Sequence, residues 1–143
     1  MRVGVLRRFR NASISMDVYA DGLVNGLRAV CPDWEIHELA PRLDSSEMKA
    51  AKKGRGVFII EGIRKYYERY WRFPQSLKKE DADIFHIIDH SDGHLLYWLK
   101  KFQKKAAITC HDIINLVAPE TFENRAQLPG LSMMVWEKSV KEM

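Results

Sequence analysis

Residues 83–112, DIFHIIDHSDGHLLYWLKKFQKKAAITCHD, decide the fold. This stretch holds two short apolar runs typical of buried strands, Ile84–Ile88 and Ala106–Cys110. Between the runs, four apolar residues recur at helical spacing: Leu95, Leu96, Leu99 and Phe102. A strand, a helix and a second strand predict a βαβ unit, in which ligands bind beyond the carboxyl ends of the strands.

The same alternation runs through the rest of the chain. We predict a strand at Val3–Leu6, a helix over residues 15–30 ended by Pro32 and a strand at Trp34–Leu39. Val57–Phe73 fits an amphipathic helix, or a strand that runs into one, and Pro74 stops it. A last helical segment follows Leu131. This order predicts a single α/β domain over residues 1–143: a Rossmann-like three-layer domain with a parallel sheet and helices on both faces.

Composition limits the classes of protein that fit. At 143 residues, 46% of them hydrophobic, the chain is typical of one globular domain, and no apolar run approaches the roughly 20 residues of a membrane span. The two cysteines, Cys31 and Cys110, match no metal spacing and favour reduced thiols in a cytoplasmic protein. Gly22 and Gly26, four apart on the first predicted helix, suggest that it packs closely on the sheet.

Positive charge is concentrated in one segment. Residues 49–79 carry ten basic and two acidic side chains, although the whole chain has a net charge of only +4. Two interpretations fit the basic, aromatic helix Gly62–Phe73. It packs its apolar side on the core, with Glu68 and Arg72 paired on the other side, or it docks on the inner face of an anionic membrane. Nucleic acid is not expected as a partner, because no nucleic-acid motif accompanies the charge.

Titratable residues follow both strands of the βαβ unit. His90, Ser91 and Asp92 come after the first strand, and His111 and Asp112 come directly after the second. A His-Asp pair at a sheet edge can hydrogen-bond a polyhydroxylated ligand. Asp92 also fits a helix cap. His94 lies four residues after His90, but no third ligand is evident, so we expect no metal.

The loop between the first strand and the first helix occupies the usual phosphate-binding position of an α/β sheet. Its small and polar residues would let a ligand approach the backbone: Asn11, Ala12, Ser13 and Ser15. It contains no glycine, so neither a dinucleotide fingerprint nor a P-loop is present. An ordinary strand-to-helix turn explains the loop equally well.

Together these segments resemble the N-terminal domain of retaining GT-B-fold glycosyltransferases of the group 1 type. The resemblance covers most of the chain and rests on the first strand, the helix SMDVYADGLVNGL at residues 15–27, DIFHIIDHSDGH at 83–94 and AITCHDIIN at 107–115. The last two segments are the most specific. A small response-regulator-like domain fits less well, because the first strand ends in Arg7 and Arg8 instead of an acidic pair.

The resemblance implies a function. Such a domain binds the acceptor, a sugar or a lipid-linked molecule, while a C-terminal domain binds a nucleotide-diphosphate sugar as co-substrate; no other cofactor is implied. His111 would be catalytic, near the donor sugar, with His90, Ser91, Asp92 and Asp112 lining the site. The loop containing Asn11 would approach the diphosphate, although the glycines of many family members are missing.

Two domains of this kind need roughly 300 residues. We therefore expect residues 1–143 to be the acceptor-binding half of a hexosyltransferase, inactive alone, with an exposed inter-domain face that would favour a homodimer. The alternative is a non-catalytic α/β module that docks on an anionic membrane or a protein partner through the helix at residues 62–73.

Overall fold

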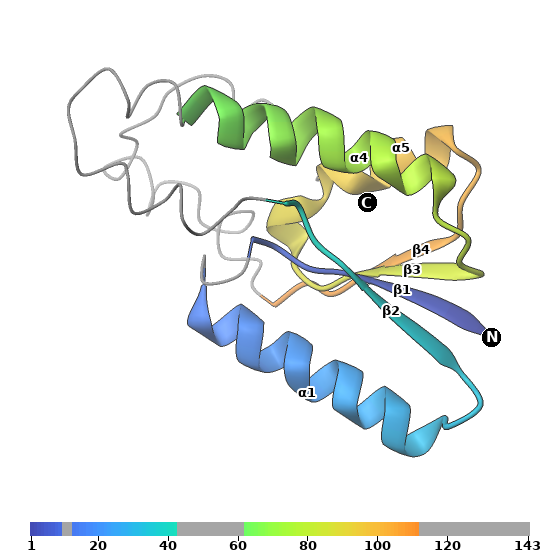
Figure 1. Cartoon of the computed structure of the whole chain (residues 1–143). Helices are drawn as coiled ribbons and strands as arrows, with labels where there is room; N and C mark the ends of the chain where they lie inside the picture. The colour runs from blue at the N-terminus through green and yellow to red at the C-terminus, as the bar shows by residue number, and fades with distance from the viewer. Residues whose placement is uncertain (10–12, 43–61, 112–143) are drawn as a thin grey trace.

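A computed structural model describes residues 1–9, 13–42 and 62–111 of the chain (Figure 1). Its centre is a four-stranded sheet in the order β2-β1-β3-β4, with every neighbouring pair parallel. The strands are β1 (Arg2–Leu6), β2 (Glu35–Leu39), β3 (Ile84–Ile87) and β4 (Ala106–Ile108). The predicted α/β class with a parallel sheet is therefore confirmed, and each predicted strand of the described ranges is present.

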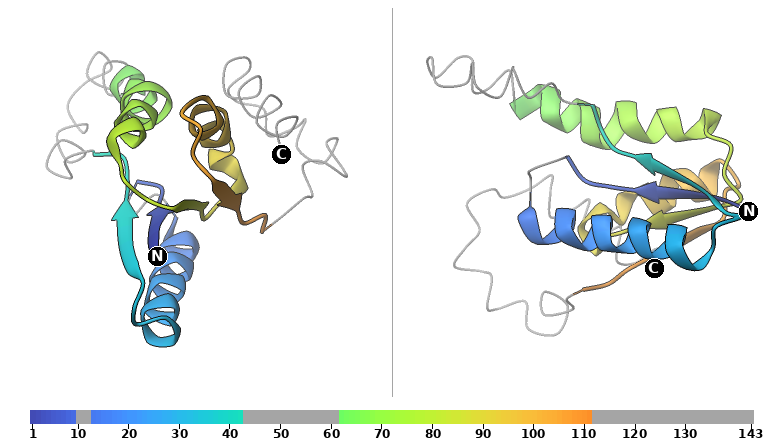
Figure 2. Two further views of the ribbon diagram at one scale, coloured as in Figure 1. Left: turned by 90° about the vertical axis from the view of Figure 1, so that its right-hand side faces the viewer. Right: turned by 60° about the horizontal axis from the view of Figure 1, so that its bottom comes forward.

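Helix α1 (Ile14–Val30) packs on one face of the sheet. It begins after Ser13, whose backbone is extended and whose side chain makes no capping bond, and it ends at Cys31, before Pro32. Its buried residues Ala20 and Val24 contact Val3, Val5 and Ile88. The left view of Figure 2 shows α1 on the opposite side of the sheet from the other helices.

The second core cluster lies on the other face. Here α4 (Phe73–Ser76) and α5 (His94–Lys101) cover the sheet together with the 3-10 turn η2 (Leu77–Lys79). The buried residues of this cluster are Leu6, Phe73, Leu77, Phe85, Ile87, Leu95 and Leu99. Because Leu6 and Val5 point to opposite faces of β1, one central strand contributes to both clusters.

Pro74 does not stop the preceding helix, so that prediction is wrong. Residues 62–67 are α-helical, a π-turn η1 (Glu68–Arg72) follows, and α4 continues through Pro74. The N–H of Phe73 donates to the carbonyl of Glu68, five residues earlier. A proline ring normally clashes with the carbonyl four residues before it, and the wider π-turn gives it room.

The π-turn also changes which side of this helix faces the core. The apolar side predicted to pack inward includes Ile63, Tyr66, Tyr67, Tyr70 and Trp71. Tyr70 is half-buried, but the other four side chains are exposed, and Glu68 is buried. One extra residue in a turn shifts the phase of a helix by about 100°. The predicted pair of Glu68 with Arg72 is confirmed at 3.0 Å.

The glycine that allows close packing is Gly4 on β1, not the predicted Gly22 or Gly26 on α1. A Cβ placed on Gly22 or Gly26 would meet nothing within 4 Å, so their predicted role in packing α1 on the sheet is wrong. On β1, a Cβ at Gly4 would lie 2.8 Å from the Phe85 ring. No helix within the described ranges is long and apolar enough to cross a bilayer.

Candidate functional site

The order of the strands locates the site. The order in which the chain adds strands reverses between β1 and β3: β2 is added on one side of β1, and β3 and β4 are added on the other. In an open parallel sheet a crevice forms at that point, beyond the carboxyl ends of the strands. Arg7 and Arg8 follow β1 here, and residues 89–92 follow β3. The carboxyl end of β4, which carries His111, lies at the same edge.

Asp89 organises the turn after β3. Its Oδ1 accepts the Ser91 N–H at 2.9 Å, which starts the short 3-10 turn η3 (His90–Asp92), and its Oδ2 accepts from Nη1 of Arg8 at 3.0 Å. Burial opposes ionisation of this carboxyl. The hydrogen bond from Ser91 and the charge of Arg8 outweigh burial and hold the pKa of Asp89 below its ordinary value.

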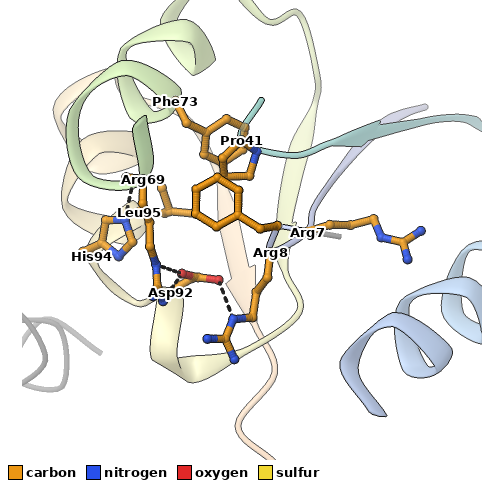
Figure 3. A pocket seen from close by; sticks show the side chains of 9 residues that line it. Arg7, Arg8, Pro41, Arg69, Phe73, Asp92, His94 and Leu95 are labelled. Atoms are coloured by element: carbon orange, nitrogen blue, oxygen red, sulfur yellow. Dashed lines mark hydrogen bonds and ion pairs between the residues drawn. The ribbon is translucent and has the colours of Figure 1, made fainter. Parts of the chain in front are cut away.

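Asp92 is held by two arginines from different elements (Figure 3). Nε and Nη2 of Arg69 donate to its Oδ1 at 2.9 and 2.6 Å, and Nε of Arg8 lies 3.8 Å from its Oδ2. Arg69 also donates to the carbonyl of Ser91 at 3.1 Å. The interpretation of Asp92 as the cap of α5 is therefore wrong. The residue before α5 is Gly93, and no side chain caps the helix.

A small pocket of about 80 Å³ lies beside this ion cluster. It has four apolar walls, Phe9, Pro41, Phe73 and Leu95, and its polar lining consists of Arg7, Arg8, Arg69, Asp92 and His94. Nε2 of His94 donates to the carbonyl of Arg69 at 3.1 Å, and its ring stacks at a tilt on Tyr70. Burial lowers the pKa of His94, so this imidazole is neutral near pH 7.

Arg7 is buried but belongs to a different set of contacts. Its guanidinium points away from the pocket toward α1 (Figure 3). Nη1 donates to Asp21 at 2.7 Å and to Glu38 at 2.6 Å, which ties the end of β1 to α1 and β2. Arg8 and Arg69 are therefore the cations that face the crevice.

His111 is exposed, yet its ring has two fixed contacts. Nε2 donates to the carbonyl of Ile88 at 2.8 Å, and the ring meets that of Tyr19 edge-on, with centroids 4.5 Å apart. The hydroxyl of Tyr19 lies 3.2 Å from Oγ1 of Thr109, which in turn lies 2.7 Å from Nε2 of His86. The ring of His111 thus rests on α1 and on the end of β3.

The structure brings some of the predicted site residues together. Ser91 and Asp92 meet on Arg69, and His90 lies beside Asp89, with Nδ1 3.4 Å from its Oδ1. Ser13 and Ser15 lie at the start of α1, their hydroxyls 3.1 Å apart. The predicted residues Asn11, Ala12 and Asp112 fall outside the described ranges.

Four residues that shape this region are absent from the sequence prediction: Arg8, Asp89, Arg69 and Tyr19. Arg8 could have been found, because it directly follows an apolar strand. An unbroken 3.6-residue period predicts that Arg69 lies on the solvent side of its helix, because that period takes no account of the π-turn. No sequence signal pointed to Tyr19, which reads as one of several apolar residues of an amphipathic helix.

The chemistry of the region is hydrogen bonding and charge. Within residues 1–9, 13–42 and 62–111, no three His, Cys, Asp or Glu side chains cluster as metal ligands would. The edge offers carboxylates, arginines and imidazoles, which suit a ligand with hydroxyl or phosphate groups. No family model, curated protein or solved structure matches the chain.

Proposed function

We propose that this chain is the acceptor-binding N-terminal domain of a glycosyltransferase that moves a hexose from a nucleotide-diphosphate sugar to an acceptor hydroxyl. One observation carries the proposal: His111, after β4, lies at the same carboxyl edge of the sheet as the cluster of Arg8, after β1, Asp89 and Asp92, after β3, and Arg69. Carboxylate and imidazole acceptors suit sugar hydroxyls. Arginine suits the diphosphate that leaves in such a reaction.

The roles follow from these contacts. His111 would accept a hydrogen bond from a hydroxyl near the reacting centre, and Asp92 would orient the acceptor. His90 and Ser91 would complete the lining of the acceptor side. A second domain that binds the nucleotide-sugar would face this edge, so transfer needs both domains and no further cofactor.

The test is ligand mapping by NMR on the chain itself. We expect hexoses, disaccharides or nucleotide-diphosphate sugars to shift the signals of residues 90–92 and of His111. His111→Ala should weaken that binding about tenfold, the effect of losing one hydrogen bond to the ligand. The matched control is His37→Ala, which removes a half-buried imidazole on β2, away from the carboxyl edge of β3 and β4. Binding unaffected by His111→Ala, or shifts confined to other surfaces, would contradict the assignment.

A second candidate is favoured by a different observation. Ile63, Tyr66, Tyr67 and Trp71 are 66%, 40%, 56% and 53% exposed along one helix, in a basic part of the chain. Aromatic side chains next to lysine and arginine suit the interface of an anionic bilayer. This face would dock the protein on a membrane, with or without sugar transfer.

Liposome sedimentation separates this candidate from the first. Binding to phosphatidylglycerol vesicles should exceed binding to phosphatidylcholine vesicles and should weaken as salt increases. The double change Ile63→Ser with Tyr67→Ser should lower the bound fraction about fivefold or more. Val18→Ser removes an exposed apolar side chain from α1, on the other side of the sheet, and should leave binding intact. Equal loss in both variants would argue against a specific docking face.

A further inference from the structure

The hydrogen bond to Ile88 fixes the protonation pattern of the His111 ring. A backbone carbonyl only accepts hydrogen bonds, so Nε2 of His111 carries the proton that it donates over 2.8 Å. In the neutral ring, Nδ1 is then a hydrogen-bond acceptor. Among the described residues none donates to Nδ1. An exposed imidazole with this pattern presents an acceptor to any ligand at the sheet edge.

Tyr19 holds the ring in place from the other side. The two rings meet at an interplanar angle of 87° with centroids 4.5 Å apart, an edge-to-face contact that resists rotation of either ring. Tyr19 belongs to α1, and α1 is packed on the sheet through Ala20 and Val24. The position of His111 therefore depends on a helix that is remote from it in the sequence.

Tyr19 is itself fixed by a short chain of polar contacts. Its hydroxyl meets Oγ1 of Thr109 at 3.2 Å, and the same oxygen meets Nε2 of His86 at 2.7 Å. The N–H of Thr109 donates to the carbonyl of Ile87 at 2.9 Å, which extends the pairing of β3 with β4 toward His111. Burial lowers the pKa of His86, so this series of polar contacts ends at a neutral imidazole in the sheet.

We propose that Tyr19 is a positioning residue, which acts with Thr109 and His86 to hold His111 in one orientation and to present its Nδ1 to a hydroxyl group of the ligand. The ligand class is a polyol, because each of its hydroxyl groups can donate a hydrogen bond to this ring nitrogen and accept one from neighbouring donors. The identification of this polyol as the sugar of a transfer reaction rests on the proposed function. The orientation of His111 is independent of the proposed function.

The test follows the Nε2 proton of His111 by 1H–15N NMR in the full chain. In the wild-type protein we expect a visible Nε2–H signal, protected from exchange with water by the bond to Ile88. Tyr19→Leu removes the ring contact and should raise the exchange rate about fivefold or more, the size expected for the loss of one aromatic ring pair. Tyr19→Phe and Thr109→Val both remove the hydroxyl contact but keep the ring, so they should give smaller and similar increases.

The control is Tyr67→Leu, which removes an exposed tyrosine from the helix at residues 62–67 and should leave the exchange rate unchanged. Backbone amide spectra report whether each variant keeps the fold. Wild-type exchange in Tyr19→Leu, or a proton on Nδ1 instead of Nε2, would overturn the proposal. If exchange responds as expected but no hexose or nucleotide-sugar binds, the positioning role stands and the proposed function fails.

Discussion

The carbonyl of Arg69 accepts its hydrogen bond from the ring of His94, not from its own helix. In the π-turn, the N–H of Phe73 is bound to Glu68, and the next residue, Pro74, has no N–H to offer. The Arg69 carbonyl is therefore without a partner in its helix, and Nε2 of His94 supplies the donor from α5. One proline thus explains the contact that joins two helices beside the pocket.

Arg69 should contribute more to stability than its neighbour Arg72. Replacing Arg69 by Met leaves Asp92, whose side chain is 8% exposed, without its principal partner. Loss of one member of a buried pair costs about 3–5 kcal/mol, and the partial exposure of Arg69 lowers our expectation to about 2–3 kcal/mol. Arg72→Met removes a 59% exposed side chain and should cost about 1 kcal/mol or less. Urea denaturation measures both, and equal losses would contradict this ranking.

Acid should destabilise the fold partly through His94. Burial lowers the pKa of this imidazole in the folded protein, whereas in the unfolded chain it titrates near its ordinary value of 6.5. Below that pH the unfolded state binds more protons, so the free energy of unfolding falls as the pH falls.

The variant His94→Gln keeps an N–H donor for the Arg69 carbonyl but does not titrate. Its stability should decline less between pH 7 and pH 5, by at most about 1.4 kcal/mol per pH unit for one proton. His86, whose pKa burial also lowers, should behave in the same way, and the double variant should show the flattest profile. Urea midpoints at several pH values measure the slopes, and parallel profiles for variant and wild type would rule out this role.

Gly4 and Gly22 should respond oppositely to alanine. At Gly4 the added methyl would lie 2.8 Å from the Phe85 ring in a closed part of the sheet, and overpacking of this kind costs about 1–3 kcal/mol. At Gly22 it meets nothing within 4 Å, and alanine in a helix interior should stabilise by about 0.5–1 kcal/mol. Thermal melting of the two variants tests the contrast. A stable Gly4→Ala protein would mean that the Phe85 ring moves freely.

Arg7 and Arg28 both form an ion pair with Glu38 but differ in burial, so their variants can be compared directly. Arg7 is 4% exposed and also binds Asp21, so Arg7→Met leaves carboxylates around a buried space and should cost about 2–4 kcal/mol. Arg28 is 53% exposed, and Arg28→Met should change stability by less than about 0.5 kcal/mol. Chemical denaturation of both variants gives the comparison. A similar small effect of each would show that the Arg7 cluster is not needed for folding.

The sheet was predictable because its strands are short apolar runs bounded by polar residues. β1 and β3 coincide with their predicted positions within a residue or two, and the turn after β3 was recognised from its polar cluster. Parallel pairing then follows from the alternation with helices, since each crossover returns the chain to the same edge. These features are local, so the residues that form them are enough to predict them.

The ion cluster was not predictable in the same way. Arg69 and Asp92 are 23 residues apart, and their contact depends on the phase of a helix with one π-turn. Pro74 signals some irregularity, but it does not say whether the helix stops or widens. Tyr19 meets His111 only because the packing of α1 sets where its ring points. Side-chain pairs of this kind are decided by tertiary packing.

The place of β1 in the middle of the sheet also bears on how the protein is made. Its two neighbours begin at Glu35 and Ile84, so the first strand to leave the ribosome must wait for residues far along the chain before both of its edges are paired. Until then the nascent chain has an open strand edge that can pair wrongly. Slow translation or a delay between β2 and β3 would prolong that exposure, and chaperone dependence during synthesis is the expected result.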